Sequence, residues 1–342
     1  MEKLKSIELV PRVIGKKAAI FRADTDIPES DNKRLENSVP SIIHLLQKGW
    51  TIVIIGHKGR PESREKGPSL IPVCSKLKEI LENKLGREIN STFIDDITDE
   101  AKIKDAIDQY EIIFTDNIRF YPGERKGDTS HLKILKKYCS IFVYDAIAVA
   151  HRTEGSVILH REMETYYGFN FIEEYQAMET LNKRTGRLVI FGGSKEDKLD
   201  NLIKIAQQSN AVFIGGKLPL SRQKIEEKLG KIPQNVFWAQ LSENKYDLSS
   251  DDISKLKTLI TIHPTIVWTG ALGWFEKGYK KGTTEITTAL IKSKSYIAIG
   301  GGDTTASIVD LGGKDEIDFP CSAGGALLFS LANGPENLPA VS

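Results

Sequence analysis

The sequence contains few cysteines and no long apolar segment. Its three cysteines, Cys74, Cys139 and Cys321, show no CxxC spacing, which disfavours both a disulfide framework and a cysteine metal site. No segment approaches the ~20 apolar residues of a membrane span, and the N-terminal residues MEKLKSIELVPR lack the apolar core of a signal peptide. We therefore expect a globular cytoplasmic protein whose cysteines are buried small side chains.

The sequence also lacks an excess of charge of either sign. Its 47 Lys and Arg residues balance 46 Asp and Glu residues, which leaves a net charge of +1. That balance argues against a general nucleic-acid or membrane binder, although a local cluster of arginines can still bind a small anion.

Two common nucleotide-binding signatures are missing. No Gly-Lys pair is followed by Ser or Thr, so the chain has no Walker A loop. Gly300 and Gly302 begin a G-x-G-x-x-G pattern, but Thr305 stands where the third glycine is required. The second absence argues against a dinucleotide-dependent oxidoreductase.

Short apolar runs recur along the whole chain and alternate with helical patterns. Helices are expected over 35–48 and 70–85, and alternation of strand with helix predicts parallel α/β sheets. The predicted strands begin at Ala18, Thr51, Thr92, Glu111, Ile141, Arg187, Ala211, Val236, Thr265 and Tyr296.

The length of 342 residues predicts about two domains. The strand pattern restarts after a polar helical segment near residues 171–183, which marks the joint. We predict an N-terminal domain over 1–165, an interdomain helix over 166–185 and a C-terminal domain over 186–330. The last segment, 331–342, is expected to return to the N-terminal domain.

Basic side chains follow the predicted strands of the first half. Carboxyl ends of parallel strands meet at one edge of a sheet, where ligands of open α/β sheets bind. A lone arginine is most often a surface ion pair, but several at strand ends suit a phosphate or carboxylate, which a guanidinium binds in a bidentate way. Five basic residues lie after predicted strands, and Arg34 lies at the start of the first predicted helix. We call the six together the basic cluster: Arg22, Arg34, His57, Arg60, Arg119 and Arg152.

The corresponding positions of the second half are rich in glycine. In SYIAIGGGDTTASIV, three glycines follow a predicted strand, so backbone N–H groups can approach an anion closely at the start of a helix that Thr304 and Thr305 are suited to cap. Asp303 there suits a Mg²⁺ ligand, whereas the plain structural alternative is an N-cap. The glycine loops are FGGSKEDK at Phe191, IGGKLP at Ile214, WTGALGWFE at Trp268, this stretch, and CSAGGALL at Cys321.

Eight motifs in this order resemble phosphoglycerate kinase across nearly the whole chain. FRADTDIP is similar to the family's RVDFNVP, GHKGRP to SHLGRP, DNIRF to ENVRF, and DAIAVAHR to DAFGTAHR. FGGSKEDK resembles GGAKVSDK, WTGALGWFE resembles WNGPMGVFE, GGGDTTA resembles GGGDTAA, and AGGALL resembles GGGASL. The resemblance implies two Rossmann-like, doubly wound domains with a hinged cleft between them. It also implies ATP-dependent phosphorylation of 3-phosphoglycerate by a monomer that binds neither nucleic acid nor membrane.

The resemblance assigns roles to individual residues. The basic cluster would bind 3-phosphoglycerate, with Arg34 also catalytic, and Asp24 and Asp26 would lie beside the substrate. Lys195, Gly324 and Gly325 would stabilise the phosphoryl group during transfer. Mg²⁺ with ATP or ADP would lie against Asp303, and the other nucleotide-binding residues implied are Lys195, Lys198, Gly215, Gly216, Glu276, Gly301, Gly302 and Thr304.

The chain departs from the family pattern at several of these positions. Asp26 replaces an Asn, Glu154 replaces the second His of HRxHxS, and Lys195 and Lys198 are three apart instead of four. Thr269, Ala271 and Ala323 replace Asn, Pro and Gly in the glycine loops, and the stretch 217–263 is short. Two interpretations stay open: a compact, active kinase, and a degenerate relative that binds ligand without turnover.

Overall fold

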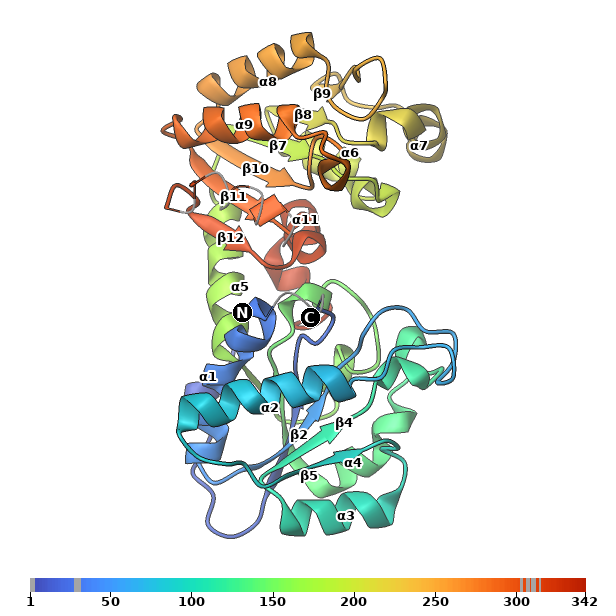
Figure 1. Cartoon of the computed structure of the whole chain (residues 1–342), viewed down its shortest axis with the longest axis vertical. Helices are drawn as coiled ribbons and strands as arrows, with labels where there is room; N and C mark the ends of the chain where they lie inside the picture. The colour runs from blue at the N-terminus through green and yellow to red at the C-terminus, as the bar shows by residue number, and fades with distance from the viewer. Residues whose placement is uncertain (1–3, 28–31, 302–303, 306–307, 309–311, 314) are drawn as a thin grey trace. The chain divides into compact units, whose positions relative to one another are not determined.

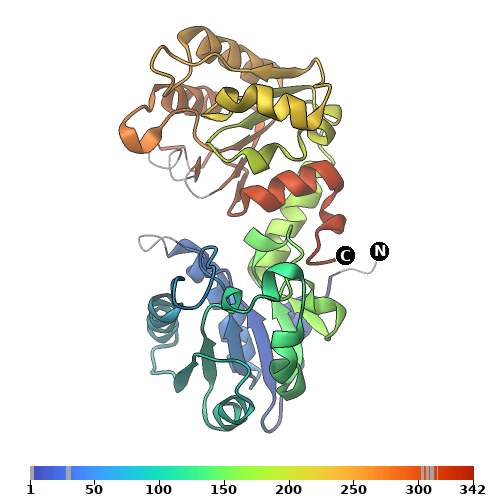
Figure 2. The ribbon, with the colours of Figure 1, turned by 90° about the vertical axis from the view of Figure 1, so that its right-hand side faces the viewer.

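A computed structural model describes residues 4–27, 32–301, 304–305, 308, 312–313 and 315–342. Its contacts divide the chain into an N-terminal unit, Met1–Tyr175 with Leu338–Ser342, and a C-terminal unit, Gln176–Asn337. Each unit is built on one sheet with helices packed against it (Figures 1 and 2). Among the described residues, no helix is both long and apolar enough to cross a bilayer.

The sheet of the N-terminal unit has six parallel strands in the order β3-β4-β2-β1-β5-β6. Its central strands are buried along their whole length, which explains why they appear in the sequence as unbroken apolar runs. The strands are β1 (Ala18–Arg22), β2 (Thr51–Ile55), β3 (Ser91–Ile94), β4 (Ile112–Thr115), β5 (Cys139–Tyr144) and β6 (Thr165–Tyr167).

Two helices, α1 (Lys33–Gln47) and α2 (Ile71–Leu85), cover one face of this sheet. Leu35 of α1 and Leu77 of α2 pack in one core with Phe21 and Ile54 of the strands. Two further helices, α3 (Glu100–Gln109) and α4 (Lys133–Tyr138), contact each other beside β3 and β5. Helices of the same unit thus pack against the strands and hold the strand ends in place.

The C-terminal unit repeats this plan with six parallel strands in the order β12-β11-β10-β7-β8-β9. Its core surrounds Trp268, which is fully buried, with Leu256 and Ile286 from two covering helices. The strands are β7 (Arg187–Phe191), β8 (Ala211–Ile214), β9 (Val236–Trp238), β10 (Thr265–Thr269), β11 (Tyr296–Gly300) and β12 (Phe319–Cys321). The helices are α6 (Leu202–Gln207), α7 (Arg222–Leu229), α8 (Ser250–Ile262), α9 (Lys281–Ile291) and α11 (Gly324–Asn333).

The division between the units falls inside helix α5 (Phe169–Asn182), between Tyr175 and Gln176. Asp145, which follows β5, accepts a hydrogen bond from the Phe171 backbone N–H at 2.9 Å and so anchors the first turn of α5. The helix α11 ends at Asn333 within the C-terminal unit, and Leu338–Ser342 belong to the N-terminal unit. The Ala340 N–H there donates to Ala150 O at 3.1 Å.

The predicted fold class, two parallel α/β domains, is confirmed. Every strand predicted from an apolar run forms, and both predicted helices form within two residues of their expected starts. The sequence analysis missed β6 and β12, which have three residues each and lie at sheet edges. Unlike β9, which is equally short but lies in the apolar run VFWA, neither segment lies in a continuous apolar run, so only their pairing with a neighbouring strand reveals them.

Candidate active site

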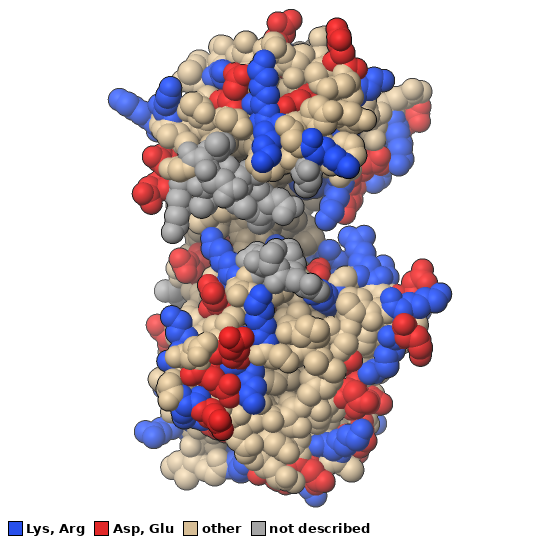
Figure 3. All heavy atoms as spheres, in the orientation of Figure 1, with Lys and Arg blue, Asp and Glu red and all other residues tan. Residues whose placement is uncertain are grey.

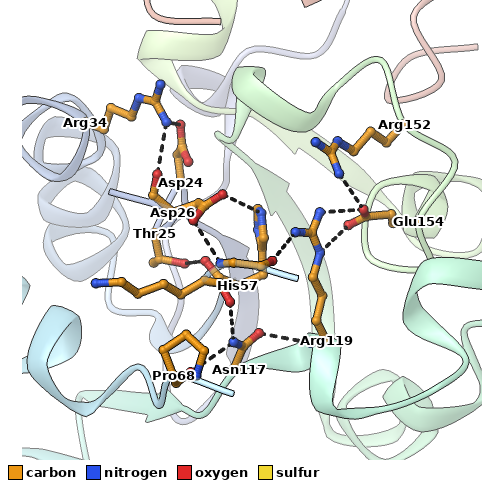
Figure 4. A network of polar contacts seen from close by, with 12 residues as sticks. Asp24, Thr25, Asp26, Arg34, His57, Pro68, Asn117, Arg119, Arg152 and Glu154 are labelled. Atoms are coloured by element: carbon orange, nitrogen blue, oxygen red, sulfur yellow. Dashed lines mark hydrogen bonds and ion pairs between the residues drawn. The ribbon is translucent and has the colours of Figure 1, made fainter. Parts of the chain in front are cut away.

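The predicted substrate residues gather at the carboxyl edge of the N-terminal sheet (Figure 4). Arg22 is the last residue of β1 and its side chain is fully buried. Its Nε donates to Ser156 Oγ at 3.0 Å, and its two terminal nitrogens contact Ala23 O at 2.5 Å and His57 Nδ1 at 2.8 Å. Arg22 is thus held in place by three acceptors on three segments of the chain.

The protonation of His57 follows from these contacts. A guanidinium can only donate, so the Nδ1 atom facing Arg22 accepts and the proton of a neutral ring lies on Nε2. That Nε2 lies 3.5 Å from Asp26 Oδ2. Burial lowers the pKa of His57, and the nearby Arg22 charge adds to this effect against the opposing contact with Asp26. His57 is therefore a neutral donor that points toward Asp26.

The two acids after β1 differ in environment. Asp26 is half-exposed, and the contact with His57 lowers its pKa, so it is ionised at neutral pH. Its Oδ1 accepts the Gly59 N–H at 2.9 Å, and its carbonyl accepts from Arg34 at 3.1 Å. Asp24 lies 3.7 Å from Arg34, and its Oδ1 is buried without a hydrogen-bond partner among the described residues. Such an orphaned acceptor suits a ligand hydroxyl.

Arg119 does not present an open guanidinium. Its Nε and one terminal nitrogen donate to the two oxygens of Glu154 at 3.3 and 2.5 Å, and its other terminal nitrogen donates to Gly59 O at 2.5 Å. Arg152 contacts the same Glu154 carboxylate at 3.3 Å. Arg60 follows Gly59 directly and its side chain is exposed. The structure thus brings the whole basic cluster to one edge, with Glu154 inside it.

Three supporting residues escaped the sequence analysis. The Asn117 side-chain amide donates to Lys58 O and Pro68 O at 2.8 and 3.1 Å, and its Oδ1 accepts the Arg119 N–H. Thr25 donates to His57 O at 2.8 Å, and Ser156 holds Arg22. Small polar residues after strands are too common to single out by pattern alone, so only these contacts identify them.

In the C-terminal unit, three glycine loops touch through their backbones. A Cβ atom on Gly192 would lie 2.1 Å from Gly270 O, and one on Gly216 would lie 2.5 Å from the Gly193 backbone, so only glycine fits at these positions. Backbone hydrogen bonds join Gly193 N–H to Ala271 O at 2.7 Å and Lys217 N–H to Gly193 O at 2.8 Å. The loops after β7, β8 and β10 therefore form one continuous surface.

The two predicted lysines of this unit differ in exposure. Lys195 is exposed and precedes the 3-10 turn Glu196–Leu199, whereas Lys198 lies within that turn and donates to Gly192 O at 3.2 Å. Lys195 therefore extends from a loop residue, whereas Lys198 extends from a 3-10 turn. The shortened spacing is accommodated without placing both lysines on one regular helix.

Thr304 and the start of α11 complete this surface. Thr304 is buried, and its hydroxyl accepts the Gly270 N–H at 2.7 Å, which ties the loop after β10 to the loop after β11. Gly324 and Gly325 form the first turn of α11, and a Cβ on Gly300 would lie 3.1 Å from Gly324 Cα. The N-terminus of α11 thus lies beside the end of β11.

Part of the predicted nucleotide site is not described. Gly302 and Asp303 lie outside the described residues, and so does the side chain of Glu276. An aromatic residue that the sequence analysis did not single out, Trp274, lies in the same loop, with Lys217 Nζ 3.6 Å from its ring centroid. No group of three or more His, Cys, Asp or Glu side chains able to hold a metal occurs in the part of the chain that is described.

Charge is distributed differently inside and outside this region. Over the face drawn in Figure 3, basic and acidic side chains alternate on both units. At the carboxyl edge of the N-terminal sheet, by contrast, four charged side chains are buried together: Arg22, Asp24, Arg119 and Glu154. Burial of charged groups is costly unless they are paired, so their concentration at one edge indicates a built anion site.

Comparisons with known proteins identify the family of this chain. A family model described as phosphoglycerate kinase matches residues 12–228 and 222–333. A phosphoglycerate kinase of Campylobacter fetus is 30% identical, with 91% of this chain and 90% of that protein covered, and one of Akkermansia muciniphila is 27% identical, with 93% of each covered.

Two solved phosphoglycerate kinases share the fold. The structure from Pyrococcus horikoshii has a TM-score of 0.78 at 22% identity, with 99% of this chain and 98% of that chain covered. The structure from Coxiella burnetii has a TM-score of 0.72 at 24% identity, with the same coverage.

Proposed function

The chain belongs to the phosphoglycerate kinase family, and on that premise we propose that it transfers a phosphoryl group reversibly between ATP and the carboxylate of 3-phosphoglycerate. The observations that carry this proposal are two separate sites, one at the carboxyl ends of the strands in each unit. One is a cluster of arginines around the orphaned Asp24 oxygen, and the other is a surface of glycine loops that excludes side chains.

In this proposal the N-terminal unit binds the acceptor substrate. The basic cluster binds the phosphate and carboxylate of this substrate through Arg22, Arg34, His57, Arg60, Arg119 and Arg152. The substrate hydroxyl donates a hydrogen bond to Asp24 Oδ1. The attacking carboxylate is already ionised at neutral pH, so the reaction needs no general base. One carboxylate oxygen bonds to the γ-phosphorus as the bond to the ADP oxygen breaks.

The C-terminal unit binds the nucleotide. Lys195, exposed just before a 3-10 turn, contacts the phosphoryl group during transfer, and Lys198 binds the nucleotide phosphates. Gly215 and Gly216 lie against the adenosine, Glu276 binds the ribose, and Gly301, Gly302 and Thr304 line the phosphate turn. The N–H groups of Gly324 and Gly325, at the start of α11, stabilise the charge that develops on the phosphoryl oxygens.

Asp303 is the residue proposed to hold Mg²⁺. A single carboxylate together with nucleotide phosphates is the usual way in which proteins bind this ion, and the ion neutralises phosphate charge. Asp303 lies outside the described residues, so its role rests on its position after three glycines in the sequence. Titration of ATP with and without Mg²⁺ tests whether nucleotide binding depends on the ion.

One assay tests the function as a whole. Purified protein is given ATP, Mg²⁺ and 3-phosphoglycerate, and formation of 1,3-bisphosphoglycerate is coupled to NADH oxidation. Turnover supports the kinase. The alternative, a relative that binds ligand without turnover, is favoured by the closed Arg119–Glu154 pair, and it predicts binding of both ligands without product.

The setting proposed for this activity is glycolysis in the cytoplasm, with a monomer as the active form. Light scattering on the purified chain tests the monomer, since a dimer would double the expected mass of 38.1 kDa.

A further inference from the structure

The Glu154 carboxylate accepts hydrogen bonds from the Arg119 guanidinium in the way that a bound anion would. Arginine offers two parallel N–H groups along its Nε edge, the arrangement that receives a phosphate or carboxylate in bidentate fashion. Both of those groups donate to Glu154, and a third N–H group donates to Gly59 O. The side chains of Arg119 and Glu154 are only 1% and 7% exposed. A ligand therefore cannot reach that edge of Arg119 while Glu154 stays in place.

The same carboxylate reaches a second member of the basic cluster. Glu154 Oε1 accepts from Arg119 and from Arg152. Five arginines of the cluster carry five positive charges and His57 is neutral, while Asp24, Asp26 and Glu154 subtract three, so the net charge is +2 (5 − 3). Charge alone therefore makes this site a weaker attractor of anions than its count of arginines suggests.

Glu154 is ionised in this setting. Burial on its own would raise the pKa of its carboxyl group, but the hydrogen bonds and charge of Arg119 outweigh burial and lower the pKa. The Glu154 carbonyl accepts backbone hydrogen bonds from Val157 at 2.9 Å and Ile158 at 3.1 Å, so its backbone is fixed. The place of the carboxylate is therefore decided by side-chain torsions, which can change without unfolding the loop.

We propose that Glu154 is a specificity-determining residue, an internal anion with which an incoming phosphate or carboxylate must compete for Arg119 and Arg152. This proposal rests on the proposed function for its natural ligand, a phosphorylated hydroxy acid, but the competition applies to any small anion. A strongly charged ligand displaces the Glu154 carboxylate, whereas a weakly charged one leaves Arg119 closed. Glu154 thereby sets how strongly charged a ligand must be before Arg119 and Arg152 become available to bind it.

The test is Glu154→Gln, which keeps the shape of the side chain and removes its charge. Calorimetric titration with inorganic phosphate and with 3-phosphoglycerate should show the Kd of both falling by about tenfold or more, the scale of one charge-assisted hydrogen bond that becomes available. Glu162→Gln is the matched control: it makes the same change in net charge at an exposed pair with Lys136, and it should leave both Kd values unchanged.

Glu154→Asp is the second variant. Its carboxylate keeps the charge but is one methylene shorter, so it should hold Arg119 less well and give Kd values between those of the wild type and Glu154→Gln. Thermal unfolding of each variant verifies that it is folded. If both variants bind phosphate more weakly than the wild type, Glu154 merely positions Arg119 and the proposal is overturned, as it is by unchanged affinity.

The two probes separate this proposal from the proposed function. Tighter phosphate binding by Glu154→Gln, with no binding of 3-phosphoglycerate by either protein, would uphold the internal anion and reject the substrate. Unchanged phosphate affinity in Glu154→Gln, together with turnover of 3-phosphoglycerate by the wild type, would reject the internal anion and uphold the kinase.

Discussion

The candidate sites of the two units are built by opposite means. The candidate site of the N-terminal unit consists of long charged side chains, several of them buried. Their orientation depends on hydrogen bonds with partners such as Ser156, Asn117 and Glu154. In the C-terminal unit the contacts come from the backbone, and what matters is that side chains are missing at Gly192, Gly216 and Gly270. The first site is therefore sensitive to charge, and the second is sensitive to volume.

The largest effect is expected for Arg119→Ala. Removing this guanidinium leaves the buried Glu154 carboxylate with only its longer contact to Arg152, and breaking a buried pair in this way costs about 3–5 kcal/mol. Urea unfolding should show that loss in the free energy of unfolding. Adding Glu154→Gln to the variant should recover part of it, because the buried charge that lost its main partner is then gone. A variant as stable as the wild type would show that the pair contributes nothing to the fold.

Lys195→Ala tests an exposed charge of the C-terminal site. We expect kcat to fall by roughly 10²-fold with a smaller change in KM, since a charge aimed at the phosphoryl group acts mainly in the transition state. Steady-state kinetics in the coupled assay measures both constants. Lys204→Ala, which removes a lysine that contacts Asn333 on α11, is the control and should leave kcat intact. Equal kcat in all three proteins would remove Lys195 from catalysis.

Arg60→Ala asks whether the charge sensitivity of the N-terminal site extends to an exposed arginine. Loss of a charge-assisted hydrogen bond worth about 1.5–3 kcal/mol should raise the KM for 3-phosphoglycerate by roughly tenfold or more and leave the KM for ATP unchanged. Arg64→Ala is the control, since that guanidinium donates to Asp95 O at 2.7 Å instead. Similar KM values for both variants would mean that Arg60 is a surface charge.

Gly270→Ala tests the volume sensitivity of the C-terminal site and is expected to have the smallest effect. The added Cβ would lie 2.3 Å from Gly192 O, and the residue has φ of +88°. Overpacking of this kind costs about 1–3 kcal/mol, and we expect weaker MgATP binding with unchanged binding of 3-phosphoglycerate.

Gly278→Ala is the matched control for that substitution. It has a similar φ of +85° but nothing within 4 Å of the new Cβ, so it carries the backbone strain without the clash. Equal nucleotide affinity in the two variants would mean that strain, and not the close approach of the loops, explains any loss.

The sequence was sufficient for the fold class, for the strands that appear as apolar runs and for the shared sheet edge of the basic cluster. Strands buried on both faces must be apolar along their length, so β1, β2, β7 and β10 are visible in the sequence without any partner. Because the sheets are parallel, residues after these strands necessarily share an edge, which is why Arg22 and His57 could be placed together before any contact was known.

Only the tertiary structure decided what those residues do to one another. Arg119 and Glu154 are 35 positions apart, and nothing in their local patterns indicates that one fills the donor edge of the other. The same holds for the proton on His57 Nε2 and for the close approach of Gly192 to Gly270. Strand burial is a property of local composition, whereas pairing of charges depends on distances and side-chain torsions between distant segments, which local composition does not contain.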